Sequence, residues 1–479
     1  MDWLDDGLSE ANDFIWGPYL LIPLLLAAGL YLTVMLRGLQ FRKLGPALHL
    51  ALIQRKETDP RVQGDITHYQ ALTTALAATI GVGNIAGVAT AFFLGGPGAL
   101  FWMWVTGLLG MATKYSEAFL GVRFRLTDAS GLMSGGPQRY LRHIPARWGI
   151  HWGMVLGVFF AIAGAIAAFG IGNGVQANTV ANSADDRWGI PTWLTGLVLV
   201  LVAGAVILGG IKVIGRVTAA VVPVMAVGYV LGATALLALN VGELPGAFRL
   251  IFTDAFTGTD AVVGGFAGAG IMTAIRYGVA RGIFSNESGL GTGGIAAAAA
   301  KSTHPTRQGL VSMTQTFLDT LVVVTFTGLT IVVTGVWDTG DEALEGATMT
   351  LAAFEEGLGG WATHLVVLAI VFFAVSTLIG WSYYGDRCVE SLFGIRHFFS
   401  IGRFDLNTTT VYRLAFVVMI YIGATADLGL VWTFSDAANG MMALPNLVGL
   451  FVLAPLVARE TRRYLQDPEG EIRRAQKDM

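Results

Sequence analysis

A glycine-rich interruption divides one apolar segment of the chain. Gly81-Val82-Gly83-Asn84 falls inside the apolar run from His68 to Leu94, which is otherwise long enough to cross a bilayer. Glycine and asparagine continue a helix poorly, and each backbone group left unpaired in hydrocarbon costs several kcal/mol. A broken membrane helix is therefore tolerated only where protein, water or a ligand satisfies its ends. We expect this break to line the site of function.

The two half-helix ends that face each other across this break have opposite polarity. The first half ends in carbonyls near Ala77 to Ile80, which suit a cation, and the second begins with amides near Gly83 to Ala86, which suit an anionic carboxylate. Asn84 can cap the second half, ligate a cation, or bond to a neighbouring helix. One break thus offers poles for both a cation and an amino acid.

Two further segments carry polar side chains at the ends or in the middle of apolar runs. Gln176 follows the glycines of segment 170–174, and its amide can reach a carboxylate or an ammonium group; the alternative is a wet helix end near the outer surface. Ser376 and Thr377 can complete the oxygen shell that hard cations prefer, or bond back to the preceding turn. Trp381 suits core packing or a pocket wall.

The composition places these residues in a membrane protein. Of the 479 residues, 54% are hydrophobic and only 13% are charged, whereas a soluble domain carries about 25% charged residues. The net charge of −3 argues against a nucleic-acid partner. The single cysteine, Cys388, excludes an internal disulfide. The sequence contains no phosphate-binding loop, nucleophile elbow or zinc-protease motif, so we expect no enzyme.

The apolar pattern predicts an all-α polytopic membrane protein with eleven spans. They are Ile15–Leu36, Tyr69–Leu94, Ala99–Leu120, Trp152–Gln176, Pro191–Gly209, Val217–Leu239, Val262–Phe284, Leu310–Val336, Thr363–Tyr384, Val411–Ala426 and Ala437–Val457. The acidic leader Met1–Asp13 lacks the basic region of a signal peptide, so the first span is expected to be retained.

The distribution of charge predicts the orientation of these spans in the cell membrane. With the N-terminus outside, 26 of the 30 Lys and Arg residues fall on inside segments, while the outside segment Trp337–Trp361 carries acidic residues and no base. This asymmetry follows the positive-inside rule. It predicts an outside N-terminus, a cytoplasmic C-terminus, and a cytoplasmic tail over residues 458–479.

The spans after the first divide into two blocks of five with opposite orientation. Residues 1–479 are then one transporter domain, in which helix 15–36 precedes a first repeat at 69–239 and a second at 262–457. Each block opens with a glycine-interrupted helix, the second at Gly264–Thr273, which permits an inverted repeat. Packing against a neighbouring helix is the alternative role of these glycines.

Few charged residues enter the spans. Lys114 and Glu117 lie three apart on one helical face, so we expect them to neutralise each other. Arg276 and Asp319 are expected to make structural pairs, because neither predicted span carboxylate is near the break in sequence. Glu287 falls in a predicted inside connection, where it would cap or pair.

Four stretches resemble the alanine-or-glycine:cation symporters, a resemblance that covers the chain from Phe14 to Arg459. They are GVGNIAGVA at 81–89, GNGVQAN at 172–178, RGIFSNESGLG at 281–291 and STLIGWSYYG at 376–385. This chain has Ser288 where the family usually has Ala. It has Val82 where the family often has Thr, so only the backbone at that position carries over.

The resemblance implies a LeuT-type fold and sodium-coupled uptake of a small neutral amino acid, alanine or glycine. The substrate carboxylate would meet the backbone of Val82 and Gly83 and the side chain of Gln176, with Asn84 beside them. The sodium ion would lie among five further residues of the second and ninth spans. These are Ala77, Ile80, Phe373, Ser376 and Thr377. Weaker extensions of the substrate site are Thr273, Gly278 and Trp381.

Other functions make different demands on the sequence. A channel needs a continuous polar lining, which these spans lack, and an intramembrane enzyme needs a nucleophile with a base in reach. Within transporters, the alternatives are coupling to protons and a preference for glutamine. Proton coupling would point to a carboxylate such as Glu117 or Asp319.

Overall fold

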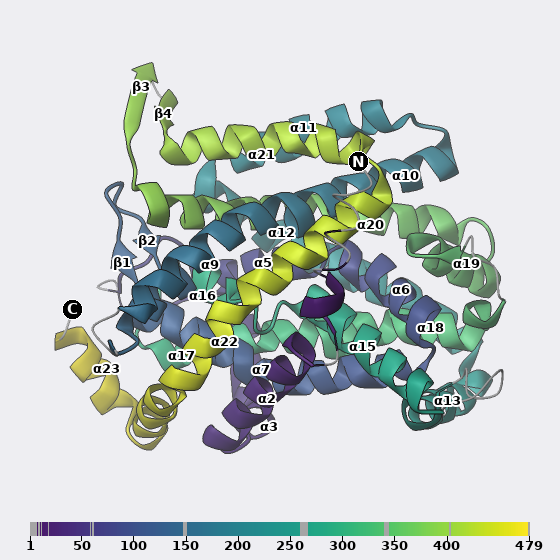
Figure 1. Ribbon diagram of the computed structural model, residues 1–479, viewed down its shortest axis with the longest axis horizontal. Helices are drawn as coiled ribbons and strands as arrows, with labels where there is room; N and C mark the ends of the chain where they lie inside the picture. The colour runs from purple at the N-terminus through teal and green to yellow at the C-terminus, as the bar shows by residue number, and fades with distance from the viewer. Residues whose placement is uncertain are drawn as a thin grey trace.

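The structure, a computed structural model, describes residues 7, 10, 12–17, 19–57, 59, 62–146, 151–258, 267–339, 344–401 and 404–477. Helices make up most of these residues and pack into one bundle (Figure 1). The described strands form two short antiparallel hairpins. They are β1 (Leu126–Thr127) with β2 (Met133–Ser134), and β3 (His397–Ile401) with β4 (Phe404–Asn407). The prediction of a mainly helical protein is confirmed.

The helices of the first half of the chain occupy the following ranges: α2 (Leu21–Met35), α3 (Leu39–Arg42), α4 (Leu44–Leu48), η1 (His49–Gln54), α5 (His68–Thr79), η2 (Val82–Asn84), α6 (Ala86–Gly95), α7 (Gly98–Arg123), α8 (Pro137–Tyr140), η3 (Leu141–His143), α9 (Trp152–Phe169), η4 (Gly170–Gly174), α10 (Val175–Trp188), α11 (Thr192–Ile207), α12 (Gly210–Leu239), η5 (Val241–Glu243) and α13 (Leu244–Thr257).

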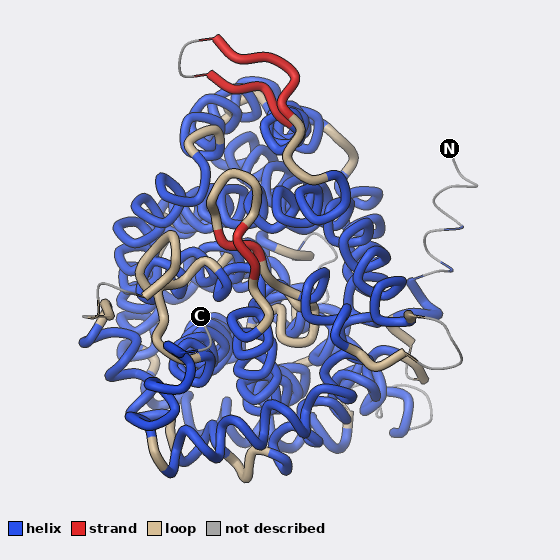
Figure 2. Tube along the Cα trace, turned by 90° about the vertical axis from the view of Figure 1, so that its left-hand side faces the viewer, coloured by secondary structure: helices blue, strands red, loops and turns tan. Residues whose placement is uncertain are grey.

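The described helices of the second half are α15 (Ala267–Asn286), α16 (Thr292–Ala298), α17 (Pro305–Thr316), η6 (Phe317–Val324), α18 (Thr325–Thr334), η7 (Val336–Asp338), α19 (Ala347–Leu358), α20 (Ala362–Phe393), α21 (Thr408–Thr425), α22 (Leu428–Gln466) and α23 (Pro468–Lys477). Both hairpins and the C-terminus gather at one end of the bundle, which we call the hairpin end (Figure 2). Helices α13 and α19 lie at the opposite end.

Within the part of the chain that the structure describes, six helical segments are long and apolar enough to cross a membrane. They are Trp152–Trp188, Gly210–Leu239, Pro305–Thr334, Ala362–Phe393, Thr408–Thr425 and Val431–Gln466. The remaining predicted spans overlap helices that are shorter or more polar, such as the broken pair α5 and α6. A helix enclosed by other helices need not be apolar all round, because its surroundings are protein.

Helix α7 lies in the middle of the bundle and packs against α15, α16 and α17. Close approach is possible because small residues meet there: a Cβ atom on Gly121 would lie 2.2 Å from the carbonyl oxygen of Gly294 in α16. Large apolar side chains on α12 and α20, among them Val224, Leu231 and Phe372, instead point outward and are more than half exposed. This is the distribution expected where lipid covers the outer helices.

The structure differs from the predicted fourth span at its end and from the predicted seventh span over the described part of its interruption. The fourth span does not stop at a wet end: a buried π-helical turn, η4, joins α9 to α10, so the helix continues to Trp188. In the seventh span, Gly264–Phe266 lie outside the described residues, while α15 is continuous from Ala267 to Asn286. The interruption instead follows at Glu287–Gly291, before α16.

Candidate functional site

The first break lies where the glycines predict it. Helix α5 begins with a capping box between Thr67 and Gln70 and ends at Thr79, and α6 starts again at Ala86. Between them, the Asn84 side chain turns back, and its Oδ1 accepts a hydrogen bond from the Gly81 amide at 3.0 Å. The Asn84 side chain thus closes the turn η2 onto Gly81, whereas α6 begins without a side-chain cap. Of its three predicted roles, the structure shows the bond to a neighbouring helix, from Nδ2 to Asp319.

Gln176 reaches this break from a different helix. Its Oε1 accepts a hydrogen bond from the Val82 amide at 3.0 Å, and its Nε2 donates to the Ile171 carbonyl of η4 at 2.9 Å. A Cβ atom on Gly81 would lie 3.0 Å from this Oε1, so glycine is needed for the approach. The buried turn of η4 thus fixes Gln176 against the amides of the first break.

The carbonyl side of the same break meets two hydroxyl groups of α20. Thr377 Oγ1 donates to the Ala77 carbonyl at 2.9 Å, and Ser376 Oγ lies 3.2 Å from that carbonyl and 2.8 Å from the Phe373 carbonyl. All four residues are buried. Four oxygens therefore converge in a cluster that we call the oxygen cluster: the carbonyls of Ala77 and Phe373 and the hydroxyls of Ser376 and Thr377.

Ile80, the fifth residue predicted for the sodium site, follows the last residue of α5. It is the last residue before the break, and its amide still bonds to the Leu76 carbonyl at 2.7 Å. Uncharged oxygens arranged in this way are suited to a hard monovalent cation.

A second break, not identified as one from the sequence, separates α15 from α16. Glu287, Gly289 and Gly291 have positive φ values of 57°, 102° and 90°, so the chain cannot continue as a helix. All residues of this segment are buried. Two glycines two residues apart in Glu287–Gly291 are the available signal in the sequence for this break. The predicted inside connection at Glu287 is, in the structure, a buried break between two helices.

Side chains of α7 and α22 satisfy the backbone of this second break. Lys114 Nζ donates to the Glu287 carbonyl at 3.1 Å. Glu117 Oε1 accepts from the amides of Gly289 and Gly291 at 2.9 and 3.0 Å, and also from Asn446 Nδ2 at 2.8 Å. Lys114 and Glu117 form the expected ion pair at 3.9 Å. The Lys114–Glu117 pair therefore supplies hydrogen-bond partners for the unwound backbone, and its two charges also neutralise each other.

The Glu287 carboxylate points to the helix that carries the oxygen cluster. Trp381 Nε1 donates to Glu287 Oε1 at 2.7 Å, and the Thr292 hydroxyl donates to Oε2 at 2.6 Å. Trp381 is buried and packs on η4, where a Cβ atom on Gly172 would lie 2.2 Å from Trp381 Cβ. Trp381 thus joins the second break to η4, the turn that also carries Gln176.

Asp319 connects the two breaks. Its Oδ1 accepts from Asn84 Nδ2 at 2.7 Å, and its Oδ2 accepts from the hydroxyls of Ser285 and Thr320, both at 2.8 Å. Asp319 is distant from the first break in the sequence, 235 positions from Asn84, but the fold places it at the break. No local pattern of residues indicates this contact.

The other predicted residues of the seventh span lie elsewhere. A Cβ atom on Gly278 would lie 2.5 Å from the Ala99 carbonyl, so this glycine faces α7. The Thr273 backbone lies beside Gly95 at the end of α6. Arg276 forms an exposed ion pair with Asp13 at 2.5 Å. The structure does not bring Thr273 or Gly278 against Gly81–Asn84.

A cavity of about 450 Å³ leads toward the first break from the α19 end of the bundle; Ala86 and Thr90 of α6 form part of its wall. Arg281 and Asp436 pair across it at 2.9 Å. Beneath them Phe284 stacks on Trp432 with ring centroids 5.0 Å apart. Asn12 and Arg281 line this same cavity, whereas the predicted topology places them on opposite sides of the membrane.

The bundle, its two buried helix breaks and the polar groups gathered between them define a multi-pass membrane transporter. The fold resembles that of MhsT in complex with L-phenylalanine, with a TM-score of 0.57 and 12% identity over 83% of this chain and 98% of that one. The chain belongs to the sodium:alanine symporter family, whose family model matches residues 1–478.

Relatives from this family align with almost the full length of this chain. The sodium/alanine symporter AgcS of Methanococcus maripaludis is 49% identical over 98% of this chain and 99% of its own. The probable sodium/glutamine symporter GlnT of Bacillus subtilis is 34% identical over 98% of this chain and 92% of its own. The family membership confirms the predicted transporter, with sodium as the coupling ion and alanine as a transported partner, and it excludes the enzyme alternative.

Proposed function

We propose that this chain imports alanine or glycine together with sodium by alternating access, and that both bind at the first break. The substrate carboxylate would meet the amides of Val82 and Gly83 beside Gln176 and Asn84. The sodium ion would enter the oxygen cluster, with Ile80 adding a carbonyl. The cation and the carboxylate would then occupy opposite helix ends, each at the pole that stabilises its charge.

One observation carries this assignment. Only the four residues Ala78–Gly81 separate Ala77, whose carbonyl accepts from the Thr377 hydroxyl, from Val82, whose amide bonds to Gln176. A cation in the oxygen cluster and a carboxylate at Val82 would therefore lie on either side of a single turn of backbone. Binding of one then favours binding of the other electrostatically, which is the thermodynamic basis of coupling.

The architecture proposed for this function consists of two interlocked halves of the chain. We propose eleven crossings, in which the broken pair α5 and α6 opens the first five-helix repeat and the broken pair α15 and α16 opens an inverted second repeat. The link from Asn84 through Asp319 to Ser285 supports it, because it ties the two broken helices to each other. The hairpin end, where basic residues are concentrated, would face the cytoplasm.

Purified protein in proteoliposomes tests the proposal directly. Uptake of radiolabelled alanine should require inward sodium and should increase with an inside-negative potential, since one charge crossing 100 mV releases about 2.3 kcal/mol. Separate arms replace sodium by choline at fixed pH, impose a proton gradient alone, and add glycine or glutamine as competitors. Uptake that persists in choline would refute sodium coupling, and uptake driven by protons alone would favour the proton alternative. Stronger competition by glutamine would reassign the substrate.

A further inference from the structure

The two broken helices are tied together at the hairpin end of the bundle. The segment that leads into α5 and the segment that leaves α16 form a short parallel bridge. Asp65 and Ile66 both donate amide hydrogen bonds to the Ala299 carbonyl, at 2.8 and 3.2 Å, and the Lys301 amide donates to the Ile66 carbonyl at 2.7 Å. Any movement that separates α5 from α16 at this end must break the bridge.

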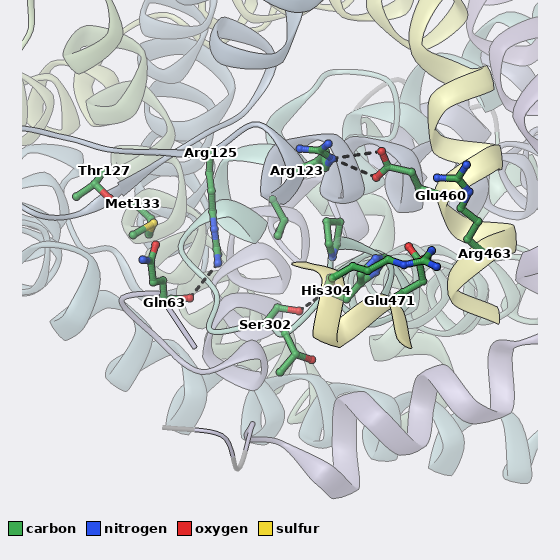
Figure 3. A pocket seen from close by; sticks show the side chains of 14 residues that line it. Gln63, Arg123, Arg125, Thr127, Met133, Ser302, His304, Glu460, Arg463 and Glu471 are labelled. Carbon is green, nitrogen blue, oxygen red and sulfur yellow. Dashed lines mark hydrogen bonds and ion pairs between the residues drawn. The ribbon is translucent and has the colours of Figure 1, made fainter. Parts of the chain in front are cut away.

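One arginine holds both strands of this bridge. Arg125 follows the end of α7, and its guanidinium donates to the carbonyls of Ala298 and Ala300 at 3.1 and 2.7 Å. On the other strand it donates to the Gln63 carbonyl at 3.0 Å, the contact drawn in Figure 3. Three donors of one planar group therefore cross-link segments that are far apart in the sequence. Lysine cannot reproduce this geometry, because its donors lie on a single nitrogen.

The bridge also depends on a close backbone approach. Gly64 has a φ of +151°, and a Cβ atom there would lie 2.5 Å from the Lys301 amide nitrogen and 2.7 Å from Ala300 carbonyl atoms. Next to Gly64, the Asp65 carboxylate accepts from the Met133 amide at 2.8 Å, which ties the same strand to the β1–β2 hairpin. The two strands of the bridge thus pack so closely at Gly64 that no side chain fits between them.

The position of Arg125 allows the closure to open. The guanidinium borders a cavity of about 420 Å³ between the end of α7, the 302–305 segment and the helices α22 and α23 (Figure 3). Among the described residues, the guanidinium of Arg125 donates to backbone carbonyls, which carry only partial charge. Nearby Arg123 instead pairs with the Glu460 carboxylate at 3.1 Å. Water in the cavity can take over the hydrogen bonds of Arg125 when the strands separate, so releasing them costs little.

We propose that Arg125 is the latch of the hairpin-end gate: it holds α5, the first half of one broken helix, against α16, the second half of the other, so that this end stays closed until transport opens it. The proposal rests on the proposed function, because alternating access requires one end to be closed while the other is open. In this proposal, sodium and substrate are released when segment 63–66 separates from segment 298–301.

A single reporter thiol tests the latch. Ile66→Cys places a thiol at a position that is 3% exposed within the bridge, in protein whose native thiol is removed by Cys388→Ala. The measurement is the labelling rate of purified protein by a charged, membrane-impermeant maleimide, with and without sodium. We expect Arg125→Gln to raise this rate by about tenfold or more through a shift toward the open population. Arg125→Lys should give a smaller increase.

Two matched variants make the result specific. Gly64→Ala leaves the guanidinium intact but forces the two strands of the bridge apart, so it should raise the labelling rate as Arg125→Gln does. If Arg125→Gln does not fold, the labelling rate of Gly64→Ala tests the latch in its place. Arg123→Gln removes a charge two residues away that does not touch the bridge, so its rate should stay within about twofold of wild type. Labelling at the wild-type rate in both Arg125→Gln and Gly64→Ala would overturn the proposal.

A second thiol separates gating from unfolding. In protein that keeps only the native Cys388, which is 1% exposed on α20, Arg125→Gln should leave labelling unchanged. An equal rise at Cys388 would mean general loosening and would refute the latch. The labelling needs no ion gradient, so it also separates the two proposals: sodium-driven uptake with unchanged labelling refutes only the latch. Increased labelling in protein that fails to transport alanine refutes only the proposed function.

Discussion

The Asp319 carboxylate accepts a hydrogen bond from the side chain of Asn84 at 2.7 Å and another from the Ser285 hydroxyl at 2.8 Å. A fully buried carboxylate thus joins Asn84 of the first break to the last turn of α15. This group contributes to the mutual position of the two broken helices, because it is the acceptor for a donor from each of them.

Replacing Asp319 should therefore uncouple the two breaks. In Asp319→Asn one acceptor oxygen becomes an NH₂ group that faces a donor of Asn84 or Ser285, and losing a hydrogen bond to a charged group costs about 1.5–3 kcal/mol. We expect sodium-driven alanine uptake at subsaturating sodium to fall about tenfold or more. Thr320→Val, which removes one donor and keeps the charge, should have a smaller effect. Equal uptake by Asp319→Asn and wild-type protein would show that the link is dispensable.

The oxygen cluster predicts a specific change in sodium dependence. Thr377→Val keeps the side-chain shape and deletes one oxygen, so the sodium concentration for half-maximal uptake should rise about threefold or more. Saturating sodium should restore most of the rate, since Val82 and Gly83 are unchanged. Ser376→Ala should behave similarly. Val375→Ala, which changes a neighbouring side chain outside the cluster, is the control. An unaltered sodium dependence in Thr377→Val and Ser376→Ala would place the cation elsewhere.

Replacing Gln176 should weaken the binding of substrate more than the binding of sodium. Gln176→Ala leaves the Val82 amide without its present acceptor and removes an amide from the proposed carboxylate site. We expect the apparent affinity for alanine to weaken by about tenfold or more, with little change in the binding of sodium alone. Asn173→Ala removes an amide from the same turn that bonds instead to Phe416 of α21, so it should change alanine affinity less. A direct binding titration distinguishes these outcomes.

His304 predicts a pH dependence of stability at the hairpin end. Its Nδ1 accepts from the Thr306 amide and so caps α17, which requires a neutral ring. Burial, helped by the charges of Arg123 and Arg307, lowers the pKa of His304 from 6.5 to about 4. Between these values the unfolded chain binds a proton that the folded protein excludes, so stability should fall as the pH drops below about 6.5.

Thermal melting in detergent at about pH 7.5 and pH 5 measures this effect, which should amount to roughly 1–2 kcal/mol at the lower pH. His304→Asn supplies a cap that does not titrate. This variant should lose less stability than wild type between the two pH values, even if it melts lower at both. An identical loss in the two proteins would assign the pH dependence to other groups.

The first break could be predicted from the sequence because its cause is local. Two glycines and an asparagine within four residues interrupt an apolar run, and helix propensity together with the cost of unpaired backbone in lipid leads directly to the break at Gly81–Asn84. The oxygen-rich character of Ser376 and Thr377 could be predicted for the same reason. The membrane class likewise follows from composition, which does not depend on how the helices are arranged.

The second break shows where local reasoning fails. Glu287 and its glycines fall between two predicted spans, so local reasoning places them in an inside connection. The structure buries this segment, because Lys114, Glu117 and Asn446 supply partners for its backbone and Trp381 supplies one for its carboxylate. These residues come from three other helices. The contacts between helices therefore supply the free energy that offsets the cost of burying the polar groups of this segment.

The sequence by itself determined the class of protein, the first break and the types of ligand that its two poles can hold, since these depend on residue type and on short-range backbone physics. Only the tertiary structure decided which distant groups meet there. Gln176 lies at Val82, Asp319 at Asn84, and Arg125 on both strands of the bridge, because long-range packing brings together residues whose separation in the sequence carries no information about their distance in space.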